Sequence, residues 1–182
     1  LVTNHLFMLG EVEKGFRCVS AISPGVSGQT GLETSEIIES LVDKFKPDFL
    51  IVIDALASRS IERISSTIQI SDTGIVPGAG VGNTRKELTE KSLGIPVIAI
   101  GIPTVVETAV VVNDALDIFI EKLQQEAKSN DYLNKLKEED NYEQIKEALL
   151  PKEFNFIVTP KEIDELIQYM SSVVAKGINM AL

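Results

Sequence analysis

The chain has 182 residues, of which 44% are hydrophobic and 24% charged, and its formal net charge is −10. This length and composition fit one folded domain with a sizeable core, and the negative charge argues against a primary nucleic-acid binder, because phosphate binding relies on clustered Lys and Arg. No uncharged apolar run is long enough for a membrane span, and the single Cys18, which we expect to be buried, excludes an internal disulfide.

The first quarter of the chain has the pattern of a helix, a strand, a loop and a second helix. Residues 1–9 have the apolar spacing of a helix end, and residues 16–23 are a strand candidate. Three glycines and a proline within residues 24–31 predict a loop whose backbone can approach a ligand closely. A helix with one apolar face then runs to Phe45.

The next segment is the apolar run Phe49–Ile53, which has the length and β-branched content of a strand buried on both faces of a parallel sheet. The run stops at Asp54, and a turn with Ser58, Arg59 and Ser60 follows. We therefore expect Asp54 at the carboxyl end of a central strand, where open α/β sheets place their chemistry. The structural alternative is that Asp54 caps the following turn through a side-chain oxygen.

The middle of the chain predicts a short helical turn at residues 61–64 and a half-exposed strand near a sheet edge at residues 66–71. Residues 72–83 are rich in glycine but lack the Lys and Ser or Thr of a phosphate loop, so we interpret them as a substrate-side loop or a plain structural loop. Residues 95–101 are a third apolar strand, and we expect it to end in a tight turn from which Thr104 caps a helix.

The last third shifts to a dense mixture of charged and amide residues at 121–153, which predicts a charged helical excursion packed at the rim, with a flexible insertion as the alternative. A short strand is expected at 154–158. Thr159 then suits the N-cap of a final helix that stops at Gly177. Strand followed by helix occurs three times, which predicts a single α/β domain over residues 1–182, with a three-layer, doubly wound, mostly parallel sheet and helices on both faces.

Long sequence motifs across nearly the whole chain resemble one known family. The segment PDFLIVIDALASRSIERISSTIQISDTGIVPGAGVGN at residues 47–83 is similar to the germination protease family of spore-forming bacteria, and so are residues 19–38, 85–106 and 158–167. The resemblance implies an atypical aspartic-type endopeptidase that degrades small acid-soluble spore proteins in the spore core cytoplasm. It also implies a homo-oligomer made as a zymogen, with no cofactor and with neither nucleic acid nor a membrane as a direct partner.

The resemblance also assigns residues. Asp54, in the motif IDALAS, matches one of two family aspartates, and the other belongs to a PDALGP-like segment expected upstream of Leu1. We therefore expect the chain to be the carboxy-terminal part of a longer protease. An aspartic mechanism needs two carboxylates that share one proton, because one must be ionised to activate water while the other protonates the substrate.

Substrate-binding candidates lie near Asp54 and in the glycine-rich segment. Arg59 suits an acidic substrate side chain, in line with the family's cleavage after glutamate, and a structural salt bridge is the alternative. Ser58 and Ser60 are candidates to orient the site by hydrogen bonds. Asp72 and Gly74 belong to a DTG triplet, and Asp72 is a candidate partner or substrate-binding residue if its strand neighbours that of Asp54.

Two further hypotheses remain open from the sequence. The chain could be a metal-dependent endopeptidase on a similar scaffold, like the nickel-sensing hydrogenase maturation proteases, which requires His5 and Asp54 to converge. A lone His without another ligand at metal-binding spacing argues against a metal site. The third hypothesis is a non-catalytic module whose loops at 24–31 and 74–82 bind a peptide or an anion.

Overall fold

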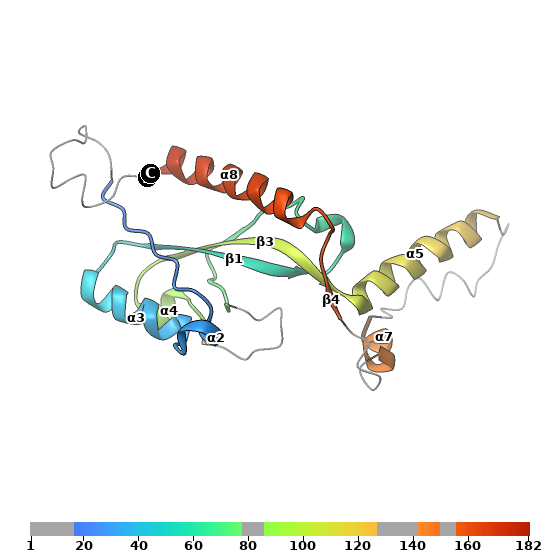
Figure 1. The fold of residues 1–182 in the computed structure, drawn as a ribbon, viewed down its shortest axis with the longest axis horizontal. Coiled ribbons are helices and arrows are strands. Elements are labelled where there is room, and N and C mark those ends of the chain that lie inside the picture. The colour runs from blue at the N-terminus through green and yellow to red at the C-terminus, as the bar shows by residue number, and fades with distance from the viewer. Residues whose placement is uncertain (1–16, 78–85, 127–141, 150–155) are drawn as a thin grey trace.

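The computed structural model describes residues 17–77, 86–126, 142–149 and 156–182 (Figure 1). One small sheet is combined with helices, which confirms the α/β class. In chain order the elements are α2 (Ser27–Thr30), α3 (Thr34–Phe45), β1 (Leu50–Ser58), the 3₁₀ turn η1 (Ile61–Arg63), β2 (Gln69–Ser71), α4 (Glu90–Leu93), β3 (Val97–Glu107), α5 (Thr108–Glu126), α7 (Tyr142–Leu149), β4 (Ile157–Val158) and α8 (Ile163–Ala181).

The sheet of the described residues is mixed. Its order is β1-β3-β2, and β4 pairs with the end of β3. β1 and β3 are parallel, whereas β2 and β4 run antiparallel to β3. Residues 59–68 join β1 to β2, which is fewer than the dozen or so residues that a parallel crossover needs. The expectation of a mostly parallel sheet is therefore wrong for this part of the chain.

Helices lie on both sides of the β1–β3 pair (Figure 1). On one side α3 buries Ile38 and Val42, and Leu50 and Val52 of β1 pack against the same cluster. On the other side α8 lines a cleft together with residues of β1 and β3. Helices on both faces were expected, while the doubly wound, three-layer arrangement and the single-domain organisation remain predictions.

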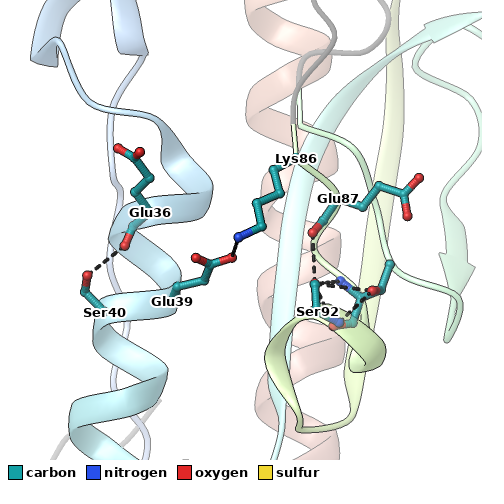
Figure 2. A network of polar contacts seen from close by, with 7 residues as sticks. Glu36, Glu39, Ser40, Lys86, Glu87 and Ser92 are labelled. Carbon is teal, nitrogen blue, oxygen red and sulfur yellow. Dashed lines mark hydrogen bonds and ion pairs between the residues drawn. The ribbon is translucent and has the colours of Figure 1, made fainter.

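A polar network joins α3 to the segment that leads into α4 (Figure 2). Lys86 forms an ion pair with Glu39 of α3. Thr89 and Ser92 form a capping box at the start of α4, in which each side chain accepts a hydrogen bond from the other residue's backbone N–H. A partly exposed ion pair adds at most about 1 kcal/mol, so the caps and the buried cluster set the position of this segment.

β3 is longer than the apolar run at 95–101 suggested. It continues through Gly101 to Glu107, so the predicted turn after Gly101 and the helix cap by Thr104 are wrong. The register with β1 skips Thr104, which forms a bulge directly after Pro103. A proline without an N–H suits such a bulge, and the bulge frees the Thr104 carbonyl, which accepts the Thr159 hydroxyl at 2.9 Å.

The same hydrogen bond explains the start of the final helix. Thr159 was expected to be its N-cap, but its hydroxyl is engaged with the sheet and α8 begins at Ile163. Gly177 was expected to end the helix, yet the helix continues to Ala181. Both expectations are wrong because a tertiary contact fixes the start, and because glycine near a helix end does not by itself stop it.

The first described residues differ from the expected strand. Residues 17–23 form only a single β-bridge, at Val19, and no strand, and Cys18 is exposed rather than buried. The predicted loop at 24–31 contains the short helix α2. The predicted helix at 1–9 and His5 lie outside the described residues.

Other expectations are confirmed in outline. The turn at 61–64 is η1, the edge strand at 66–71 is β2, and the strand at 154–158 is β4. In the predicted excursion at 121–153, α5 continues to Glu126 and α7 covers Tyr142–Leu149, while residues 127–141 lie outside the described part.

Candidate functional site

Asp54 is the fifth of the nine residues of β1, directly opposite Gly101 of β3. The expectation that it ends a central strand is wrong on both points, because β1 continues to Ser58 and lies at an edge of the described sheet. Its ladder partners in β3 continue for several residues, so the backbone of β1 stays extended as far as Ser58 even though the apolar run is interrupted. Asp54 is therefore half-buried in the middle of a strand.

The carboxylate of Asp54 lies toward the outer edge of β1. The N–H of Leu50 donates to Pro96 beside β3 at 2.9 Å. Backbone groups alternate along a strand, so those of Ala55 point away from β3. Asp54 Oδ1 accepts the N–H of Ala55 at 2.9 Å. The oxygen thus satisfies a strand-edge amide, and it is not the cap of a turn.

A cleft of about 460 Å³ lies beside Asp54, between α8 and the two parallel strands. Most of its lining is apolar. Four of the lining residues have polar side chains, namely Asp54, Thr104, Ser171 and Asn179. A mostly apolar cleft with a few polar groups is the usual form of a binding site.

Gly101 is a site-neighbouring residue that the sequence analysis did not identify. A Cβ at Gly101 would lie 2.2 Å from Cδ1 of Leu56, so the Leu56 side chain occupies the space above this glycine. Leu56 is two residues from Asp54 and therefore on the same face of β1. The signal was present in the sequence, because glycine within a strand often marks close approach of another group.

Ser58, Arg59 and Ser60 form the end of β1 and the bend after it. Ser58 is buried, and its hydroxyl donates to the Ser60 carbonyl at 2.5 Å and accepts the Ser60 N–H at 3.2 Å. This is a local turn in which Ser58 and Ser60 satisfy each other. Arg59 is exposed. Four residues of strand place the Cα of Ser58 about 13 Å from that of Asp54, so Arg59 lies well away from the carboxylate.

Asp72 and Gly74 follow β2, which does not neighbour β1. Ser71 pairs with Ala99 of β3, and Ala99 pairs on its other side with Val52. Two strand spacings therefore separate the strand before Asp72 from β1 by about 9 to 10 Å, so the structure does not bring Asp72 and Asp54 together. Asp72 is exposed.

Gly74 has a structural reason to be glycine. Its φ is +90°, and a Cβ would lie 2.3 Å from the carbonyl oxygen of Leu88. This close approach accompanies the paired hydrogen bonds between Ile75 and Leu88 at 3.0 and 2.8 Å.

The described residues contain no group of three or more His, Cys, Asp or Glu side chains arranged to hold a metal ion. His5, which the metal hypothesis requires, lies outside them. Within the same part of the chain, no helix has the length and apolar composition needed to cross a bilayer.

Comparison with known proteins now adds to this geometry. The family model for germination protease matches residues 1–135 and 131–182, which together span the chain. The chain belongs to the germination protease family. Proteins named germination protease from Bacillus cytotoxicus, Bacillus mycoides and Bacillus cereus are each 46% identical to it over 219 residues, covering 100% of this chain and 60% of the relative.

The germination protease relatives are longer than this chain in two ways. The chain spans 60% of their length. The aligned region itself covers 219 residues against 182 here, and the two family matches meet at residues 131–135. The relatives therefore have residues that this chain lacks both outside and within the matched region.

Proposed function

We propose that this chain is the Asp54-bearing part of an endopeptidase of the germination protease family. The observation that carries the proposal is the position of Asp54, a half-buried residue that lines a mostly apolar cleft and whose carboxylate lies at the outer edge of β1, in a chain that the family model matches throughout. Asp54 acts as one of two carboxylates that activate water and protonate the substrate.

The second carboxylate comes from outside this chain. Two carboxylates that share a proton lie about 3 Å apart, and Asp72 is on the far side of β3 from Asp54. The family resemblance assigns the partner to a segment upstream of Leu1, and the greater length of the relatives supports this source. The active enzyme is then a longer polypeptide of which this chain is the carboxy-terminal part.

The substrates are small acid-soluble spore proteins, as the family resemblance implies, and the enzyme is a zymogen and homo-oligomer of the spore core. Arg59 binds an acidic side chain of the substrate. Because Arg59 lies more than about 13 Å along β1 from Asp54, this acidic residue is several positions away from the scissile bond when the substrate is extended. Arg59 therefore contributes to substrate binding rather than to the chemical step.

A chimera tests the proposal directly. This chain replaces the aligned region of the Bacillus cereus relative, and cleavage of a purified small acid-soluble spore protein is followed by mass spectrometry. Asp54→Asn is expected to lower the rate about 10²- to 10⁴-fold, the usual contribution of an acid–base group. Asp72→Asn is the matched control, because it makes the same chemical change across β3, and we expect it to retain activity.

Two other results would redirect the assignment. If this chain cuts the substrate by itself, a carboxylate from outside the chain is not needed, and Asp72 becomes the next candidate. If a chelator abolishes cleavage and nickel or zinc restores it, the enzyme is metal-dependent. Substrate binding without turnover in the chimera would support the non-catalytic module.

A further inference from the structure

The outer edge of β1 is open in the described part of the chain. Only β3 pairs with β1 there, although β1 is nine residues long and mostly apolar. The N–H of Leu50 points toward β3, and the direction of the backbone groups alternates from one residue to the next. The backbone N–H and C=O groups of Ile51 and Ile53 therefore point away from β3. A long, apolar, unpaired edge is a strong template for pairing with another strand.

The side chains beside this edge are also incompletely covered. Ile53 is 51% exposed, although it lines the cleft beneath α8. Ile167 of α8 lines the same cleft and is 46% exposed. Protein interiors are close-packed, so an apolar cleft of about 460 Å³ next to an open strand edge is the space that side chains of a neighbouring strand would occupy.

Residues 17–23 provide a separate observation. Their composition predicts a strand, yet they form none, and Ile22 is 55% exposed. A segment of this kind becomes a strand when it has a neighbour to pair with, because β-propensity mostly reflects cross-strand packing. Within it only Val19 forms a single β-bridge, so the segment is not extended into a strand.

We infer that a β-strand from the portion of the germination protease polypeptide that this chain does not cover pairs with the outer edge of β1 and fills the cleft under α8 with apolar side chains. The chain spans only 60% of its relatives, so the family has the length to supply such a strand. The inference rests on Ile51, Ile53 and the cleft, and it does not depend on the proposed catalytic role of Asp54.

A second copy of the chain is a poorer occupant. Each copy has a net charge of −10, so association is opposed by repulsion. Antiparallel pairing of two β1 strands about their middle would also bring two Asp54 carboxylates toward each other, because Asp54 is the central residue of the strand.

Amide hydrogen exchange resolves the pairing residue by residue. In this chain alone, we expect the amides of Ile51 and Ile53 to exchange at least about tenfold faster than that of Val52, which points toward β3. In the full-length Bacillus cereus relative, the amides at the positions aligned with Ile51 and Ile53 should be protected. Their exchange rates should lie within about tenfold of the rate at the position aligned with Val52. Fast exchange at those two positions in the relative would overturn the inference.

Matched variants test the cleft. The part of the Bacillus cereus relative outside its alignment is added to this chain, and binding is measured by calorimetry. Ile53→Lys should weaken binding at least about tenfold, because a charge would enter an apolar cleft. Ile70→Lys is the control: Ile70 is also exposed, at 71%, but lies in β2 at the opposite edge of the sheet, and it should leave binding unchanged.

The remaining outcomes are equally decisive. Equal weakening by the two lysine variants, or no binding together with unprotected amides in the full-length relative, contradicts the inference. Protection in this chain alone that grows with its concentration and accompanies a dimer assigns the edge to a second copy. Protection of Ile51 and Ile53 only on addition of a small acid-soluble spore protein assigns the edge to substrate.

Discussion

Gly101→Ala tests the packing next to Asp54. The new Cβ would lie 2.2 Å from Cδ1 and 2.8 Å from Cγ of Leu56. An ordinary carbon–carbon contact is about 3.5 Å or longer, so Leu56 must move by about 1.3 Å or change rotamer. Overpacking of this kind costs about 1–3 kcal/mol, and for a chain of this size we expect the melting temperature to fall by about 2–12 °C.

A matched glycine separates this clash from general effects of alanine. Gly177 lies within α8, and a Cβ there would meet nothing within 4 Å. Gly177→Ala should therefore stabilise the chain by about 0.5–1 kcal/mol, the propensity difference within a helix. Thermal and urea unfolding of the two variants should give changes of opposite sign.

A double-mutant cycle identifies the source of the change. When Gly101→Ala is combined with Leu56→Ala, the clash is removed. The free energy of unfolding of the double variant should then be higher, by about 1 kcal/mol or more, than the sum of the two single effects predicts. A Gly101→Ala variant that is as stable as the parent, or additive effects in the cycle, would refute the packing argument.

Three further predictions concern a close backbone approach, a helix cap and substrate binding. Gly74→Ala should destabilise the chain by about 2 kcal/mol or more in urea unfolding, because it places an alanine at φ +90° and a Cβ against the Leu88 carbonyl; an unchanged midpoint would contradict this. Thr89→Ala removes the capping box with Ser92 and should lower stability by about 0.5–2 kcal/mol, whereas Thr89→Asp should retain most of it. Arg59→Gln should leave stability within about 0.5 kcal/mol. In the chimera it should raise KM for spore proteins about tenfold or more, with little change in kcat; a fall in kcat alone would place Arg59 at the chemical step.

The sequence was informative where a signal is local. The apolar run at Phe49–Ile53 identified the strand β1, although β1 lies at an edge of the described sheet and not at its centre, and the 3.6-residue pattern up to Phe45 identified α3. The family motifs identified the protein family over the whole chain, because matches to long and specific sequence motifs rarely arise by chance. Asp54 was expected at the end of a central strand and lies instead in the middle of the edge strand β1, and its catalytic role stays a prediction.

The errors share a physical cause, which is that tertiary contacts decide where elements begin and end. β1 continues past Asp54 because β3 offers partners as far as Val106. Thr159 does not cap α8 because its hydroxyl binds the carbonyl freed by the β3 bulge. Neither partner is visible from the residues next to Asp54 or Thr159 in the sequence.

The sequence by itself determined the class of the fold, the two long apolar strands, the main helices and the family. The tertiary structure alone decided the direction of β2 and β4, the separation of Asp72 from Asp54 by β3, and the open edge of β1 beside the α8 cleft. Local pattern reports which face of an element is apolar, because that depends on residues a few positions apart. Strand order and direction depend on which distant segments pair, and this is settled only when the whole chain has packed.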